Sequence, residues 1–372
     1  MIRWRFNWAS WALVLLLAIC GSASAQTVPV SGTADVTELS QRLDKRFAVI
    51  PAPVSCVLNN PAVDNAPIIN AALNRLAGEV ELPAGAIYTR SSIVLPRRTG
   101  ITLRGQGCTI ALPRNSFDRA NPAMTGGPAT RIIYLGPADQ PAVKYLGSMG
   151  RLDGLTIQRG DMPQPPAPQP RDGSVGLQIG GSVGLATGKL YVPQLSIMGF
   201  DTAVSVVATS DGESSDQNVF GQFWSEHNWT TFRSTANQSV ANHFLDLTVG
   251  GFCETVFDVQ NGGAPLVDNL TLNNRALILR LAAPQHNIAN CTIQNLKVDN
   301  NAAGWRLVNA PKAWGLRLRV GGEMGNKATP GPNAVNIVPA NQPEHIDAEI
   351  DLWNGATYKR WEWQAVGQGE TK

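Results

Sequence analysis

A short strand-like unit recurs along most of this chain, and its spacing restricts the possible folds more than any other feature. An apolar residue, a Thr or Ser and a second apolar residue make up the unit, which begins at Leu155, Leu195, Leu247, Leu270 and Cys291, with related triplets at Phe223 and Leu316. From Leu195 onward, successive starts are 28, 24, 23, 21 and 25 residues apart. Repeats with periods in the twenties are typical of solenoids, in which each repeat packs only against its neighbours. The pattern therefore predicts a stack of parallel strands.

The segment from residue 64 to residue 112 predicts how this stack begins. Asp64 and Asn65 can cap a helix, and Pro67 suits a first helical turn. Apolar residues then recur at three-to-four spacing up to Gly78, so we expect a short amphipathic helix over residues 65–77. Short apolar runs separated by Gly and Pro follow it. Such a helix would cover the open strand edges at one end of the stack.

Two stretches in this segment resemble the amino-terminal region of the pectate-lyase-like families. Residues 78–88 read G-E-V-E-L-P-A-G-A-I-Y, and residues 100–107 read G-I-T-L-R-G-Q-G. These families, pectate lyases and rhamnogalacturonases among them, fold as right-handed parallel β-helices whose barrel is closed by a helix. The resemblance implies an all-β, right-handed parallel β-helix with a short N-terminal capping helix. It is specific for the fold and much less so for chemistry, because one fold carries many functions.

Composition divides the chain into four segments. Residues 1–25 have the features of a signal peptide, because Arg3 and Arg5 precede a short apolar run and a cleavage-type Ala-Ser-Ala ends at Ala25. We expect a polar leader over residues 26–60, the β-helix domain over residues 61–355 and a C-terminal tail over residues 356–372. The protein is therefore expected to be secreted or periplasmic, without stable membrane insertion once the signal is cleaved. An uncleaved signal that acts as an anchor is the alternative.

The charge balance gives no reason to expect a nucleic-acid partner. The chain has 30 Lys and Arg residues against 28 Asp and Glu residues. Arg3 and Arg5 lie in the expected signal peptide, which has no acidic residue, so the remaining segment is neutral. Nucleic-acid-binding domains are usually basic.

Tryptophans suggest a sugar-binding surface. The middle residues of the triplets should point outward and stack as a column, and there Trp224 takes the place that Thr or Ser has in most other repeats. Trp229 follows it closely. Exposed indoles suit stacking on the apolar faces of sugar rings, so both are assigned to substrate binding. In the alternative, the rings fold onto neighbouring loops.

A second outward column is expected in the strand that follows each triplet. It contains Ser205, Arg233, Asp258 and Arg280, with Arg306 in the next turn. Neighbouring Arg and Asp side chains could pair as a surface salt ladder, which would contribute little stability. They could instead bind the carboxylates of an acidic polysaccharide, with Arg280 as a substrate-binding residue.

The candidate catalytic residues are Glu226, His227, Arg233 and Asp258. Residues 223–228 read F-W-S-E-H-N, which is similar to the W-x-D-H motif of pectate lyases, whose acidic residue is a calcium ligand. An acid beside a histidine can serve as an acid/base pair, and the alternative is an ordinary polar turn. The R-x-P-x-x-R motif of that family is absent, so its catalytic base has no counterpart here. Calcium stays open as a cofactor, and no metal ligands are assigned.

Two hypotheses follow for function. In the first, an exported pectate-lyase-like protein acts on or binds a polysaccharide, in particular an acidic one, by β-elimination if it is a lyase. In the second, the protein is non-catalytic, either a surface or spike-like carbohydrate-binding protein or a structural β-helix. The N-T-D, D-D and G-H-G motifs of polygalacturonase-type hydrolases are absent, which disfavours that hydrolysis.

Cysteine positions lead to one further expectation. Export permits disulfides, and Cys56 and Cys108 are free to meet near the start of the coil. Cys253 and Cys291 should lie two turns apart, roughly 9–10 Å along the axis, which is too far for a disulfide. We therefore expect at most one disulfide, Cys56–Cys108, with Cys253 and Cys291 both reduced.

Overall fold

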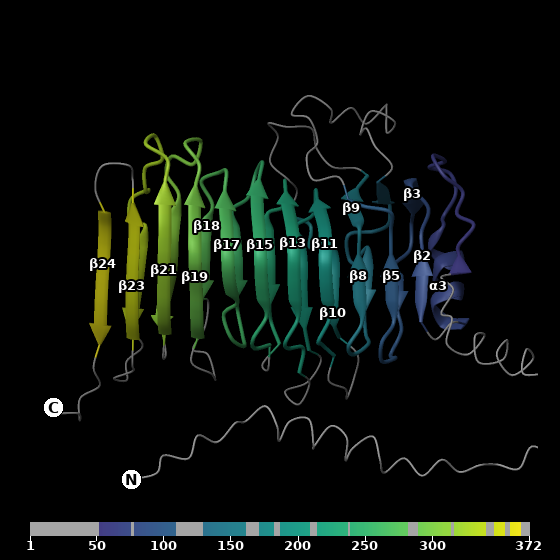
Figure 1. Ribbon diagram of the computed structural model, residues 1–372, viewed down its shortest axis with the longest axis horizontal. Coiled ribbons are helices and arrows are strands. Elements are labelled where there is room, and N and C mark those ends of the chain that lie inside the picture. The colour runs from purple at the N-terminus through teal and green to yellow at the C-terminus, as the bar shows by residue number, and fades with distance from the viewer. Residues whose placement is uncertain are drawn as a thin grey trace, which may run out of the picture. The chain divides into compact units, whose positions relative to one another are not determined.

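The computed structural model is a parallel β-solenoid. It describes residues 52–75, 78–108, 129–160, 171–181, 187–208, 214–236, 239–281, 289–313, 316–339, 346–353 and 358–365. All of them belong to the unit Ile50–Lys372, in which parallel strands stack into about eight turns (Figure 1). The expectation of an all-β, parallel solenoid is confirmed. The expected signal peptide at 1–25 and residues 26–51 of the expected leader lie outside the described residues.

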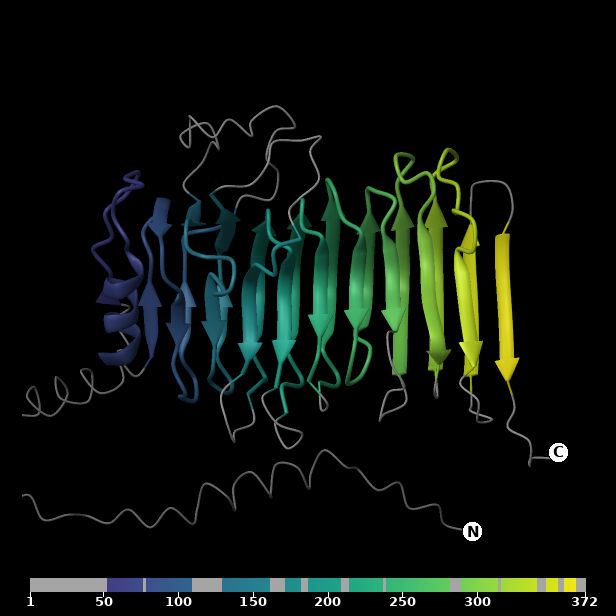
Figure 2. The same ribbon diagram turned by 180° about the vertical axis from the view of Figure 1, so that it is seen from behind.

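Two sheets build the solenoid, and we call them sheet A and sheet B. Sheet A consists of β1 (Ala52–Pro53), β2 (Glu79–Glu81), β3 (Gly85–Thr89), β5 (Thr102–Arg104), β6 (Thr130–Tyr134), β8 (Arg151–Asp153), β9 (Leu155–Arg159), β11 (Tyr191–Met198), β13 (Val219–Glu226), β15 (His243–Gly250), β17 (Leu266–Leu272), β19 (Ala289–Val298), β21 (Leu316–Met324), β23 (Ile346–Trp353) and β24 (Tyr358–Ala365). Sheet B consists of β4 (Ile93–Leu95), β7 (Val143–Tyr145), β10 (Val175–Gly180), β12 (Thr202–Val207), β14 (Thr230–Ser234), β16 (Thr255–Val259), β18 (Leu277–Leu281), β20 (Arg306–Ala313) and β22 (Val335–Pro339). From β10 to β23 the chain alternates between the sheets, so each turn adds one strand to each (Figures 1 and 2).

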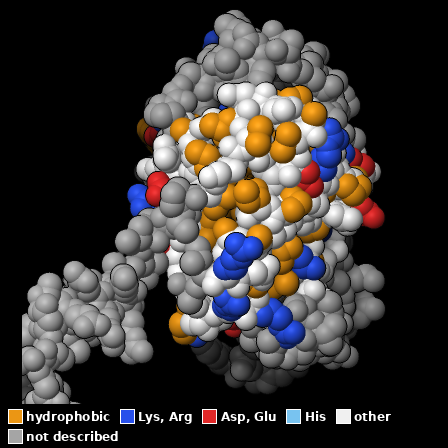
Figure 3. Space-filling model, turned by 90° about the vertical axis from the view of Figure 1, so that its right-hand side faces the viewer, with side chains coloured by type: hydrophobic (Ala, Val, Ile, Leu, Met, Phe, Trp, Pro, Cys, Tyr) orange, Lys and Arg blue, Asp and Glu red, His pale blue; other side chains and the backbone are white. Residues whose placement is uncertain are grey.

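The helix α3 (Ala66–Arg75) lies at the N-terminal end of the stack, beside β2 (Figure 1). Its first turn is capped by Asp64, whose Oδ1 accepts a hydrogen bond from the Ala66 backbone N–H at 3.1 Å. Ile69 and Leu73 are fully buried in the core, so the helix closes this end as expected. Figure 3 shows the same end, where hydrophobic side chains are interspersed with polar and basic ones.

A kink in the long strands of sheet A determines which side chains face outward. In β13 the buried residues Phe220 and Phe223 are three positions apart, and Gly221 and Gln222 between them are both partly or fully exposed. The same burial pattern recurs in β15 and β17. Each of these strands therefore presents two consecutive residues to solvent, which strict alternation along a strand does not allow.

The expected register in sheet A is confirmed from Leu195 to Leu270 and wrong after it. Leu195 pairs with Phe223, Phe223 with Leu247, and Leu247 with Leu270, but Leu270 pairs with Leu296 instead of Cys291. β19 contains two apolar triplets, one that begins at Cys291 before the kink and one that begins at Leu296 after it. Leu270 also follows the kink of its own strand, so it pairs with the second triplet. The outward column of Trp224 therefore continues with Lys297 and Glu323, and Thr292 and Arg317 do not belong to it.

In sheet B the expected column is confirmed except at its end. Ser205 pairs with Arg233, Arg233 with Asp258, and Asp258 with Arg280. The next partner is Asn309, because Arg306 is the first residue of β20 and pairs with Leu277, the first residue of β18. Arg306 is thus displaced by three positions toward the turn.

The Cys56–Cys108 disulfide is not formed, and that expectation is wrong. Cys56, Cys108, Cys253 and Cys291 are all free thiols. Cys253 and Cys291 are free as expected, with β17 between the strands β15 and β19 of their turns, and both are buried. Burial raises the pKa of both thiols to about 12, because an apolar environment disfavours the thiolate.

The last strand differs from all others in direction. β24 pairs antiparallel with β23 and falls within the segment expected to be a tail. Among the described residues, no helix is both long and apolar enough to cross a membrane.

Candidate functional site

Two neighbouring columns of side chains occupy the outer face of sheet A. One contains Trp224 between Ser196 on β11 and Thr248 on β15. The other is made of the second outward residue of each kink, and its members are Gln194, Gln222, Asp246, Asn269 and Asn295. Only amides and one carboxylate make up this second column, which we call the amide column.

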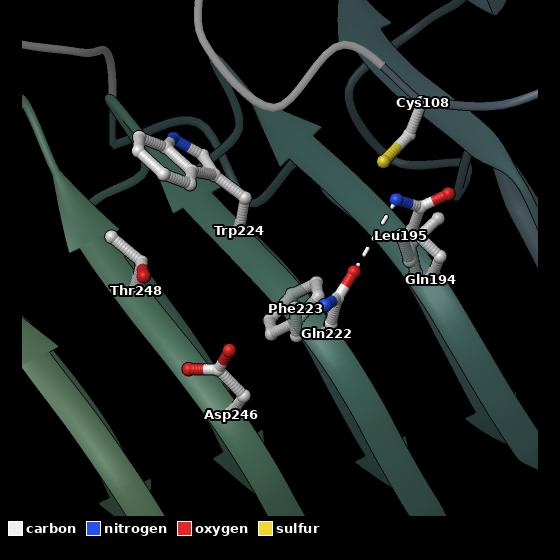
Figure 4. Close-up of a pocket in the computed structure, with 8 residues that line it drawn as sticks. All are labelled: Cys108, Gln194, Leu195, Gln222, Phe223, Trp224, Asp246 and Thr248. Atoms are coloured by element: carbon white, nitrogen blue, oxygen red, sulfur yellow. Dashed lines mark hydrogen bonds between the residues drawn. The ribbon is translucent and has the colours of Figure 1, made fainter.

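Trp224 and the upstream part of the amide column border a shallow depression, the Trp224 hollow (Figure 4). Its volume is about 230 Å³, and it is lined by Cys108, Gln194, Leu195, Gln222, Phe223, Trp224, Asp246 and Thr248. Gln194 Nε2 donates a hydrogen bond to Gln222 Oε1 at 3.4 Å. Asp246 is exposed and has no hydrogen-bond or ion-pair partner among the described residues. The hollow thus combines an aromatic ring with polar groups that can still accept and donate hydrogen bonds.

The indole of Trp224 is held in place by its polar edge. Its Nε1 donates a hydrogen bond to Glu226 Oε2 at 3.0 Å. Glu226 lies two residues further along β13, on the same outward side. The ring is half-buried, and the hydrogen bond to Glu226 fixes its orientation. A fixed ring lowers the entropic cost of stacking a ligand on it.

His227 follows Glu226 and turns the chain out of sheet A. Its φ of 52° lies in the left-handed region, so the two neighbours do not point to opposite sides as they would on a regular strand. Instead, His227 Nε2 comes within 3.8 Å of Glu226 Oε1. His227 Nδ1 accepts a hydrogen bond from the Phe252 backbone N–H at 3.3 Å, and burial lowers the pKa of the imidazole. Both effects favour the neutral ring with its proton on Nε2.

Arg233 and Asp258 pair with each other on the outer face of sheet B. Arg233 Nε donates to Asp258 Oδ2 at 3.1 Å, and Asp201 Oδ1 lies 3.7 Å from Arg233 Nη2. Asp258 is buried and also accepts a hydrogen bond from Gln260 Nε2 at 3.0 Å. The charge of Arg233 is therefore already balanced within the protein. Arg280, the next residue of the column, has no partner among the described residues.

Trp229 lies in the turn between β13 and β14 and is covered. The guanidinium of Arg171 lies 4.1 Å from the centre of its ring, and Phe252 packs at 4.9 Å. A cation over an aromatic ring is a favourable arrangement, and it occupies the surface that a sugar would use. Trp229 thus follows the alternative in which the ring packs against its neighbours.

The predicted site residues are distributed over two faces of the solenoid. Trp224, Glu226 and His227 form a contiguous chain of contacts from sheet A into the turn. Arg233, Asp258 and Arg280 lie on sheet B, whose inner side shares one core with sheet A. Within the described part of the chain, no group of three or more His, Cys, Asp and Glu side chains gathers in a way that could hold a metal ion.

Comparisons with known proteins do not show a family for this chain. No protein-family model matches the chain, and no curated protein matches it in sequence. Among solved structures, ORF18 of Geobacillus virus E2 is 13% identical with a TM-score of 0.45, covering 90% of this chain and 67% of that one. The Agl-KA catalytic domain is 12% identical with a TM-score of 0.28, covering 82% of this chain and 68% of that one.

Proposed function

We propose that the protein binds a polysaccharide along the outer face of sheet A, with Trp224 as the platform on which one sugar ring stacks. The observation that carries this proposal is the Trp224 hollow, where an oriented, half-exposed indole adjoins the amide column. Sugar rings offer apolar C–H faces to aromatic rings and hydroxyl groups to amides and carboxylates. Gln222 and Asp246 are placed to bind those hydroxyls.

Binding is favoured over β-elimination at this position. A lyase that acts on uronic acids needs a cation beside the substrate carboxylate and a base for the adjacent proton. None of the eight residues lining the Trp224 hollow is cationic, and its one charged member is Asp246. We therefore assign this face to recognition, in line with the non-catalytic hypothesis.

Export is part of the proposal. A signal peptide at residues 1–25 would bring this face into contact with extracellular polysaccharides. The parallel stack would then serve as an extended scaffold for a long ligand, because each turn repeats the outward columns one strand spacing further along.

Calorimetric titration of the full chain with a panel of neutral and acidic oligosaccharides tests this function. We expect at least one oligosaccharide to bind, and Trp224→Ala to weaken its binding by about 1–3 kcal/mol, as for a buried aromatic anchor. Ultraviolet absorbance of the same mixtures reports unsaturated products, which we do not expect.

The matched control is Trp353→Ala. Trp353 belongs to the same outward column, is exposed, and lies far along the stack on β23. Its replacement should leave the affinity unchanged. Equal losses in the two variants, or no binding to any member of the panel, would contradict the proposal.

A further inference from the structure

The Trp224 hollow carries one negative charge and no positive charge. Asp246 is the only charged residue among the eight that line it. The thiol of Cys108 also lines the hollow, and burial raises its pKa to about 11, so it is neutral at physiological pH. The side chain of Asp246 is exposed and has no hydrogen-bond or ion-pair partner among the described residues. Its carboxylate is therefore accessible to a ligand in the hollow.

No cation of sheet A among the described residues pairs with this carboxylate. The two residues that pair with Asp246 in register are neutral members of the amide column. His243, three residues earlier on β15, bonds through Nε2 to Asp268 Oδ1 at 2.8 Å. Lys297 is the first cation after Trp224 in the outward column and lies two strands beyond β15, about 9–10 Å along the axis. A cationic ligand would therefore meet an unbalanced negative charge in the hollow.

The indole of Trp224 is also suited to a cation. The face of an aromatic ring is negative and its edge is positive, so a cation is attracted to the face. The N–H at the edge of this ring already donates to Glu226 Oε2, which leaves the face for a ligand. Thr248 pairs with Trp224 in register, and Asp246 precedes it by two residues on the same strand (Figure 4). Two residues along the strand and one strand across place the Cα atoms of Trp224 and Asp246 about 8 Å apart, so one sugar unit can contact both side chains.

We propose that the Trp224 hollow binds an amino sugar, with its ring on the indole of Trp224 and its protonated amino group on the carboxylate of Asp246. This inference rests on the proposed binding of a saccharide to sheet A and specifies the ligand as cationic. Asp246 can accept a hydrogen bond from a neutral hydroxyl as well, but a charge-assisted hydrogen bond from an ammonium group is about twice as strong. An acidic sugar would bring a second negative charge toward Asp246 and is disfavoured.

Calorimetric titration of the full chain with two trisaccharides tests this inference. The trimers of glucosamine and of N-acetylglucosamine have the same rings and linkages, but only the first carries positive charges. At a pH at which the amino groups are protonated, we expect the glucosamine trimer to bind about 10-fold more tightly, because its ammonium group adds a hydrogen bond between two charged groups. This preference should disappear when the pH is raised until the amino groups are neutral.

Asp246→Asn removes the charge and retains the shape of the side chain. It should weaken binding of the glucosamine trimer by about 10-fold and leave binding of the acetylated trimer nearly unchanged. Asp139→Asn is the matched control, since Asp139 is an exposed acid that does not line the hollow, and it should affect neither trimer. Trp224→Ala should weaken both trimers, because both stack on the indole.

Three results would overturn this inference: equal binding of the two trimers, an unaffected Asp246→Asn variant, or tighter binding of the galacturonic acid trimer. If Trp224→Ala still weakened saccharide binding in that case, the proposed function would stand without it. Spermidine that binds as tightly as the glucosamine trimer would overturn the role of the sugar ring. Absence of binding by every saccharide would overturn both the inference and the proposed function.

Discussion

The outer faces of sheet A and sheet B are built from the same repeat, but they differ in how their charged side chains are paired. On sheet B the charge of Arg233 is balanced internally, because Arg233 bonds to Asp258, which also accepts from Gln260, and only Arg280 further along the column has no partner among the described residues. On sheet A, Asp246 occupies an equivalent outward place and has no partner among the described residues. The side chains around it are neutral amides that leave hydrogen-bonding capacity unused.

This comparison shows that a column of charged residues is not evidence for ligand binding. Opposite charges one strand spacing apart neutralise one another, and the pair then contributes to the fold. A surface that binds a ligand must keep polar groups unpaired in the free protein. Among the described residues Asp246 meets this condition, whereas Arg233 is paired with Asp258.

The largest expected effect concerns the stability of the two faces. Asp258→Ala should lower the free energy of unfolding by about 2 kcal/mol, because it removes a buried carboxylate and the hydrogen bond that Arg233 Nε donates to it. Urea denaturation measures this value. Asp246→Ala is the control on sheet A and should change stability little, since Asp246 is exposed and unpaired. Equal losses in the two variants would mean that the faces do not differ in this way.

A smaller effect is expected for oligosaccharide binding. Gln222→Ala should weaken the affinity by about 1 kcal/mol, the contribution of one hydrogen bond, whereas Arg280→Ala should leave it unchanged. Calorimetry with the oligosaccharide that depends on Trp224 provides the measurement. The reverse result would place the ligand on sheet B and restore Arg280 as a binding residue.

The smallest effect is the dependence of stability on pH at the junction between the faces. Burial lowers the pKa of His227 from its ordinary 6.5. As the pH falls through 6.5, the unfolded chain therefore binds a proton that the folded chain does not, and the folded state loses stability. His227→Asn retains a residue that tolerates the left-handed conformation and cannot titrate. Thermal unfolding between about pH 5 and about pH 7 should show a smaller loss in acid for this variant than for the wild type, and identical profiles would contradict the role of His227.

The repeat made the fold predictable, and the kink limited what could be predicted of its register. Leu195, Phe223, Leu247 and Leu270 begin clear triplets, so their alignment could be derived from the sequence. In β19 both Cys291 and Leu296 begin acceptable triplets. The three-residue spacing between Ile293 and Leu296 selects the second one, because the same spacing separates Phe244 from Leu247. A search for strict alternation does not detect that spacing.

The amide column could have been derived from the sequence, because Gln222 and Asp246 directly precede inward residues, and alternation along a strand then makes them outward. The kink adds Gly221 and Leu245 to the outward side, which alternation does not predict. Trp224, in contrast, stands out in its column by residue type alone. Which residue contacts a given charged side chain depends on the turns and on residues distant in sequence, as the packing of Arg171 over Trp229 illustrates. These contacts cannot be read from the sequence.

The outward columns of sheet A offer a long ligand nearly the same contacts at each successive turn. Turns succeed one another every 4.7–4.9 Å or so, and from Gln194 to Asn295 each turn offers similar hydrogen bonds. A chain lying along such a surface could slide by one turn and lose little free energy. Trp224 removes this degeneracy, because no other aromatic residue occurs in its column from Thr156 to Glu323. The indole would therefore select one position along the axis and act as the origin from which the rest of the ligand is aligned.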